Sequence, residues 1–197
     1  MRKLALVVWL LVPVLVGAYH YGPGQKQLLL DDVAAILAQA DRHAASGEWA
    51  EAEGRYEAAL KALPPEQVQE GRRIRLERAK AQLLAQMLPA AHQDLKSLVH
   101  ELEQDAKADR RLLAQARAAL ANSQYYMTWL MRLEGEPKEK WEPEIEASRQ
   151  NFRLLAEQAE ADGDGKAVEK NREDLESAIR LARMELSDLQ GLPLPSQ

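Results

Sequence analysis

The sequence predicts an all-α protein, in which an N-terminal signal or anchor helix precedes about seven helices stacked as hairpins. Alanine, leucine, glutamate, arginine and glutamine are abundant, whereas aromatic residues make up only 5% of the chain. This is the composition of a helical protein. Apolar residues also recur every three or four positions in several segments, and glycine and proline separate those segments. This period is typical of amphipathic helices.

Residues 1–19 predict a signal peptide or a transmembrane signal-anchor. Arg2 and Lys3 precede an unbroken apolar run over residues 4–16, which is the pattern of an export signal. A helix over residues 4–19 would be about 24 Å long at about 1.5 Å per residue, shorter than a hydrocarbon core of about 30 Å. As an anchor it is therefore marginal.

Two interpretations of this segment place the rest of the chain outside the cytoplasm. Trp9, Tyr19 and Tyr21 suit the membrane interface and favour a retained, single-pass anchor in the cell membrane. The small residues Val16 and Ala18 instead fit cleavage near Ala18, which would leave a secreted or periplasmic protein. A buried helix of a soluble domain is the third interpretation. The chain contains no cysteine, so disulfides and thiol chemistry are excluded.

After a linker at 20–28, a helical domain is expected over residues 29–190, and residues 191–197 form a tail. Its first two helices flank Gly47 as an antiparallel hairpin, and Pro64 and Pro65 end the second helix. The apolar face of the first helix comprises Leu29, Val33, Ile36, Leu37, Ala40 and Ala44, and that of the second comprises Trp49, Ala52, Tyr56, Ala59, Leu60 and Leu63.

Five further helices follow in the same way. One stripe of apolar residues lies before Pro89 and another lies after it, and each predicts a helix. A long helix is expected from about Asp109 to Leu133. The next helix is expected beyond Pro143, with Trp141 leading in. After the turn at 162–165, a last helix is expected to continue to Leu189. The apolar positions of these five helices include Leu76, Leu83, Leu95, Leu102, Leu113, Leu120, Ile145, Phe152, Leu155, Leu175, Ala178 and Leu186.

The first hairpin resembles a tetratricopeptide repeat. A unit of about 34 residues laid over 33–66 brings small residues, aromatics and a closing proline to the motif positions, namely Trp49, Ala52, Tyr56, Ala59 and Pro64. Gln39 and His43 depart from the apolar or aromatic residues usual at theirs. The resemblance is clear in this unit, weak in the next one, where Gln86 replaces the turn glycine, and lost in the third. It implies a helical scaffold that binds proteins.

Charge and motifs argue against several other functions. The net charge is −5 and becomes more negative without Arg2 and Lys3, which makes nucleic acid an unsuitable partner. The chain has no nucleophile elbow and no phosphate-binding loop, and its four histidines lack the spacing of a zinc protease. We therefore expect no enzymatic activity and no cofactor.

The acidic turn over residues 160–165 resembles part of a calcium loop. Oxygen-bearing side chains alternate up to Asp164 and a glycine follows at Gly165, as in the first half of such a loop. The position that needs a bidentate glutamate is Asn171, however. A solvated turn in which Asp164 caps the next helix is the alternative to a weak calcium site.

Residues 122–129 form the densest aromatic cluster outside the export signal. Tyr125, Trp129 and Arg132 share one face of the long helix and are residue types enriched in binding hot spots. They are our candidate anchors for a protein partner. The alternative is that this face is buried between neighbouring helices.

These observations lead to a hypothesis of function. We expect a membrane-tethered, extracytoplasmic scaffold or adaptor that mediates protein–protein interaction in the cell envelope, tethered through residues 4–19 if they are not cleaved. The first alternative is a periplasmic chaperone or translocon-associated holdase, and the second is an envelope enzyme. The sequence does not identify the partner.

Overall fold

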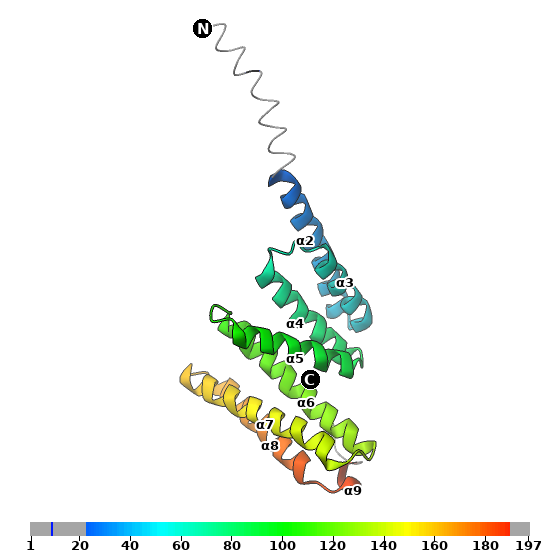
Figure 1. Ribbon diagram of the computed structural model, residues 1–197, viewed down its shortest axis with the longest axis vertical. Helices are drawn as coiled ribbons and strands as arrows, with labels where there is room; N and C mark the ends of the chain where they lie inside the picture. Colours follow the sequence, from blue (N-terminus) through cyan, green and yellow to red (C-terminus); the bar gives the residue numbers. More distant parts are fainter. Residues whose placement is uncertain (1–8, 10–22, 190–197) are drawn as a thin grey trace. The chain divides into compact units, whose positions relative to one another are not determined.

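The computed structural model describes Trp9 and residues 23–189, and helices connected by short turns make up this part of the chain (Figure 1). It contains seven helices of 14 to 24 residues and a short α9 of four residues, with no strand among the described residues. The all-α prediction is confirmed at this level. Apart from Trp9, the expected signal or anchor at 1–19 lies outside the described residues. In residues 23–189 no helix combines the length and the apolar character needed to cross a bilayer.

The chain divides into two compact units, residues 1–74 and 75–197. The first unit contains α2 (Pro23–Ala45), α3 (Trp49–Ala62) and the start of α4 (Val68–Leu84). The second contains the rest of α4, α5 (Leu88–Gln104), α6 (Arg110–Leu133), α7 (Lys138–Ala161), α8 (Gly165–Arg183) and α9 (Leu186–Leu189).

The α2–α3 hairpin of the first unit packs through small residues. Ala40, Ala52 and Ala59 have no exposed surface, so the two helices can approach closely at these positions. The Tyr56 hydroxyl also donates a hydrogen bond to the Asp41 carboxylate at 2.7 Å, which is a second contact between the two helices. Gly47 adopts a φ of +76° in the turn, a conformation that glycine adopts without strain.

The start of α2 and the end of α3 define the bounds of the hairpin more closely than the sequence does. Since α2 begins at Pro23, residues 23–28 of the expected linker are helical. Trp49 is half-buried at the start of α3, and Pro64 follows the extended residue Leu63 that ends this helix. A proline there cannot continue the helix and fixes where the hairpin stops.

The second unit begins with a cluster formed by α4, α5 and α6. Leu76 and Ala79 of α4 lie in one buried cluster with Leu95 and Leu98 of α5 and Ala116 of α6. Ion pairs between Arg75 and Glu101 and between Arg78 and Asp94 flank the contact of α4 with α5. Gln86 adopts a φ of 63° in the turn between these helices, the position at which the first hairpin has Gly47.

The start of α7 differs from the sequence prediction. This helix begins at Lys138 rather than beyond Pro143, so Pro143 lies inside it. Proline removes the hydrogen bond to the carbonyl four residues earlier, that of Glu139. Glu139 lies in the exposed first turn, where water can satisfy the carbonyl, and the helix therefore continues through the proline.

The last helix also ends earlier than predicted. The sequence predicts a continuous helix to Leu189, but α8 ends at Arg183, Met184 is extended with ψ 148°, and α9 forms a separate turn. That prediction is wrong because a residue of α6 intervenes. Arg132 donates hydrogen bonds to the carbonyls of Leu181 and Met184 and so stabilises the end of α8.

A second buried cluster holds α6, α7, α8 and α9 together. Phe152 of α7 is only 2% exposed, and Tyr125, Ile145, Leu181 and Leu189 belong to the same cluster. Helix α7 packs along both α6 and α8. The end of this cluster, where α6 meets the break between α8 and α9, contains the candidate site.

Candidate functional site

The three predicted anchor residues lie on α6 within this C-terminal cluster. Tyr125 is buried and its ring meets that of Tyr126 edge-on, with 5.7 Å between the ring centroids. Burial raises the pKa of Tyr125, the neighbouring Tyr126 adds to that rise, and the charge of Arg180 on α8 opposes it. Tyr125 therefore faces the interior next to α8.

Arg132 joins three helices. Its guanidinium binds the carbonyls of Leu181 and Met184 at the end of α8, and it stacks over the Trp141 ring of α7 at 4.7 Å from the ring centroid. Burial lowers the pKa of Arg132, whereas the carboxylate of Glu185 acts in the opposite direction. Arg132 thus positions the chain at the break between α8 and α9.

Trp129 is half-buried against the same cluster. Its indole nitrogen is buried and has no hydrogen-bond partner within residues 23–189. The structure therefore brings Tyr125, Trp129 and Arg132 into one region, as the sequence predicts, but as residues engaged by neighbouring helices. Whether they also bind a partner stays a prediction.

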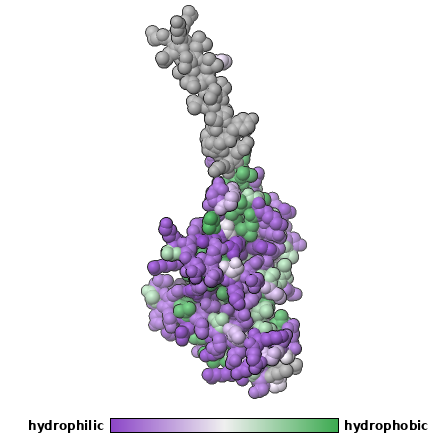
Figure 2. Space-filling view, viewed as in Figure 1, coloured by the Kyte–Doolittle hydropathy of each residue, from purple (hydrophilic) through white to green (hydrophobic). Residues whose placement is uncertain are grey.

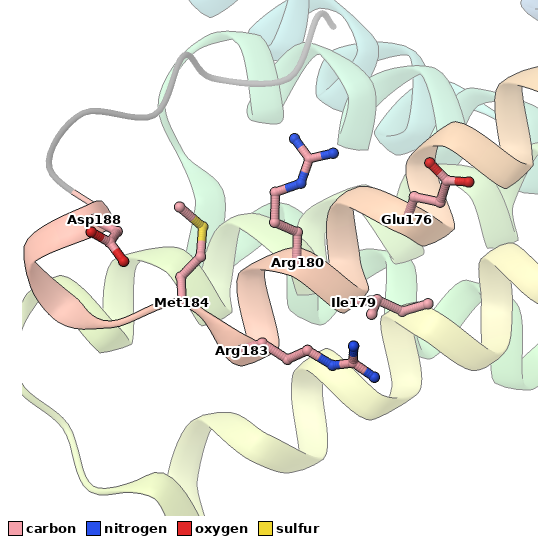
Figure 3. A pocket seen from close by; sticks show the side chains of 6 residues that line it. All are labelled: Glu176, Ile179, Arg180, Arg183, Met184 and Asp188. Carbon is pink, nitrogen blue, oxygen red and sulfur yellow. The ribbon is translucent and has the colours of Figure 1, made fainter.

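An open hollow lies directly beside this region. It has a volume of about 460 Å³ and is lined by residues of α8, α9 and the connection between them, namely Glu176, Ile179, Arg180, Arg183, Met184 and Asp188 (Figure 3). Met184 belongs to its wall and is held through its carbonyl by Arg132. Of the three predicted anchors, Arg132 therefore contacts the wall of the hollow.

The lining of the hollow combines apolar and charged side chains. Arg180 and Arg183 project from α8 in different directions, and Asp188 extends from α9 on the other side (Figure 3). Within residues 23–189 neither arginine forms an ion pair, so both can meet a negative charge from outside. Ile179 and Met184 add apolar surface between these charges. A mixed lining of this kind suits a peptide segment better than a small ion.

A buried polar cluster fixes α5, α6 and α7 to one another in the same unit. The Ser123 hydroxyl donates to the Leu120 carbonyl at 2.8 Å, so its oxygen can accept from His92 Nδ1 at 3.2 Å. His92 Nε2 lies 3.5 Å from a carboxylate oxygen of Glu144. This distance is short enough for an ion pair, but the two groups form no well-aligned hydrogen bond.

The pKa of Glu144 is lowered by its surroundings. The contact with His92 is the main cause, Lys96 at 3.9 Å and the Gln124 side chain act in the same direction, and burial opposes them. Ser123 has no exposed surface, so its hydroxyl is not open to a substrate. The cluster is a structural connection between helices.

The acidic turn before α8 provides a helix cap. The Asp164 carboxylate accepts a hydrogen bond from the backbone nitrogen of Ala167 at 3.1 Å, which is the capping role expected in one of the two interpretations. Across residues 23–189 no three histidine, aspartate or glutamate side chains converge as a metal site would require.

Sequence reasoning missed the hollow because it missed the break in the last helix. Neither glycine nor proline occurs between Ala182 and Leu189, so no local signal predicts that α8 ends at Arg183. The break depends on Arg132, which is 49 residues away from Leu181 along the chain. Only the basic pair Arg180 and Arg183 in the last turn could have drawn attention to this end of α8.

Comparison with known proteins identified no relative of this chain. No family model matches the chain, and no curated protein matches it.

Proposed function

We propose that this protein is a membrane-tethered, extracytoplasmic helical scaffold that binds another protein, with no catalytic role of its own. Residues 4–19 serve as the tether, and the helical hairpins, the first of which is similar to a tetratricopeptide repeat, form the scaffold. The tether raises the local concentration of the scaffold near partners at the same membrane. The charged start and apolar run of residues 2–16 support the tether.

The observation that carries the binding role is the hollow between α8 and α9. Its two arginines have no ion-pair partner within residues 23–189, and apolar Ile179 and Met184 lie beside them. An extended segment of a partner that carries an apolar side chain next to a carboxylate complements this lining. Arg132 contributes by holding the wall of the hollow, so the anchors predicted on α6 act in the same region.

Site-specific photocrosslinking of the full chain in membranes tests this proposal. A photoreactive residue at Ile179 should give one dominant covalent adduct with a partner protein. The charge reversals Arg180→Glu and Arg183→Glu should lower the adduct yield several-fold, since they replace attraction by repulsion. A photoreactive residue at Leu154, exposed on α7 outside the hollow, is the control position.

The pattern of adducts separates the proposed scaffold from its alternatives. A single adduct at Ile179 that is absent at Leu154 supports the scaffold. Many weak adducts at both positions, together with suppressed aggregation of unrelated unfolded proteins, would favour the holdase and overturn the adaptor. The absence of any adduct at Ile179 would overturn the hollow as the binding site.

A further inference from the structure

Three consecutive leucines at the start of α2 are exposed in a way unlike the rest of the first unit. Leu28, Leu29 and Leu30 are 56%, 48% and 36% exposed. Figure 2 shows hydrophobic side chains gathered near the start of α2, on a face that is otherwise mostly hydrophilic. Scattered single leucines on a surface need no explanation, but three adjacent ones form a patch that does.

The leucines are exposed because α2 is longer than its partner. Helix α2 has 23 residues and α3 has 14, and a short turn at Gly47 joins them directly. The first nine residues of α2 therefore extend about 14 Å past the end of α3 at about 1.5 Å per residue. Val33, which lies within the paired part, is only 3% exposed. The hairpin covers α2 from Val33 onward and leaves Leu28–Leu30 uncovered.

The arrangement of the three leucines indicates what covers them. Successive residues of a helix are about 100° apart, so Leu28–Leu30 cover about 200° of the circumference. Leu29 and Leu30 lie four and three residues before Val33 and so continue the apolar face of α2, but Leu28 widens the apolar surface beyond that face, and a surface this wide suits lipid. The leucines thus form a collar around the helix, a term we use below for Leu28–Leu30.

The neighbouring sequence identifies that lipid as the membrane of the proposed tether. The apolar run over residues 4–16 precedes the collar, and no acidic residue occurs before Asp31. Asp31 and Asp32, both exposed, follow the collar directly and have to remain in water. The change from apolar to acidic residues defines a boundary between lipid and water within α2.

We propose that the collar Leu28–Leu30 inserts into the outer interface of the phospholipid bilayer and fixes the start of α2 there. This inference rests on the proposed tether, because residues 4–19 deliver α2 to the bilayer. With the collar inserted, α2 is attached to the membrane at two points along the chain, and the hairpin is held at a fixed depth.

The absence of cysteine allows a direct test of the collar. The full-length variant Leu29→Cys is labelled with an environment-sensitive fluorophore and reconstituted in vesicles of zwitterionic and anionic phospholipid. We expect a blue-shifted emission, with quenching by shallow spin-labelled lipid at least about twofold stronger than for Leu154→Cys. Leu154, at 38% exposure, matches the collar in residue type and exposure but lies on α7.

Flotation of the vesicles distinguishes failure of the tether from failure of the collar. If the protein does not float with the vesicles, both the tether and the collar are overturned. If it floats but the label at position 29 reports water, the collar alone is overturned. A blue shift without lipid quenching, accompanied by disulfide-linked pairs when the unlabelled Leu29→Cys chain is oxidised, would show that a second copy covers the leucines and would overturn the membrane contact.

Discussion

The α2–α3 hairpin and the cluster formed by α6, α7 and α8 differ in the side chains through which their helices pack. In the hairpin, the residues without exposed surface are Ala40, Ala52 and Ala59, which permit close approach. In the C-terminal cluster, the core includes the large side chain of Phe152 and also contains buried hydroxyls. One of them, that of Ser148 on α7, donates to the Ala121 carbonyl on α6 at 2.9 Å. The closest contacts of the hairpin thus involve small residues, whereas the cluster adds large side chains and polar contacts between distant segments.

This difference matters for how each region responds to mutation. A contact made by alanines has no room for additional atoms, so the hairpin should be most sensitive to enlargement. A core built around a large aromatic residue leaves a cavity when that residue is shortened, so the cluster should be most sensitive to truncation. The following predictions are ordered by the size of the expected effect.

Truncation at Phe152 should have the largest effect. Phe152→Ala removes a fully buried ring from the C-terminal cluster and should lower the free energy of unfolding of the second unit by about 3–5 kcal/mol. Urea denaturation of the full chain in detergent, followed by hydrogen exchange resolved along the sequence, measures this change. Loss of amide protection should concentrate in α6, α7 and α8 and leave α2 and α3 unchanged.

Leu154 provides the matched control on the same helix. Leu154→Ala, at an exposed position two residues further on, should change the stability by less than about 0.5 kcal/mol. Equal losses for Phe152→Ala and Leu154→Ala would contradict the packing described for α7.

Enlargement at Ala59 should have the second largest effect. Ala59→Leu adds three carbons where α3 meets α2 and should destabilise the first unit by about 1–3 kcal/mol. Hydrogen exchange of α2 and α3 measures this effect, because it separates the hairpin from the second unit. Ala50→Leu, at an exposed position of α3, should be close to neutral. If both variants were equally stable, the close approach of α2 and α3 would be disproved.

The smallest effect concerns the polar cluster and depends on pH. Because the pKa of Glu144 is lowered in the folded protein, its contribution to stability is present above its ordinary value of 4.5 and is lost as the pH falls below it. Glu144→Gln should cost about 1 kcal/mol at pH 7, and it should flatten the loss of stability below pH 4.5. Urea denaturation at neutral and acidic pH measures both changes.

Glu142 serves as the control for the pH dependence. It lies on the same helix, and its ion pair with Lys138 at 3.0 Å is exposed. Glu142→Gln should change the stability by less than about 0.5 kcal/mol and leave the acid slope as in the wild type. A Glu144→Gln variant with the wild-type slope would mean that the contact with His92 does not couple α5 to α7.

The two regions also differ in how far their structure could be predicted from the sequence. The spacing of Trp49, Ala52, Tyr56 and Ala59 predicts the hairpin because its contacts are local and its turn is marked by Gly47. In the second unit, periodicity predicts helices but not their ends at Lys138 and Arg183. Those ends depend on solvation of the Glu139 carbonyl and on the side chain of Arg132, neither of which leaves a local signal.

In the candidate site too, the local features could be predicted from the sequence and the long-range contacts could not. The composition of residues 122–132 draws attention to Tyr125, Trp129 and Arg132, and the structure brings them next to α8. The sequence does not predict that Arg132 binds the carbonyls of Leu181 and Met184 or that a hollow forms beside Arg180 and Arg183. A hollow is a property of segments that meet in space, so its lining cannot be derived from periodicity along one helix.

The sequence by itself determined the all-α class, the number of long helices and the hairpin around Gly47, because these depend on interactions between near neighbours along the chain. Tertiary structure alone decided where α8 ends and which polar side chains are buried between α5, α6 and α7. These features arise from contacts between residues far apart in sequence, whose energies outweigh local preference.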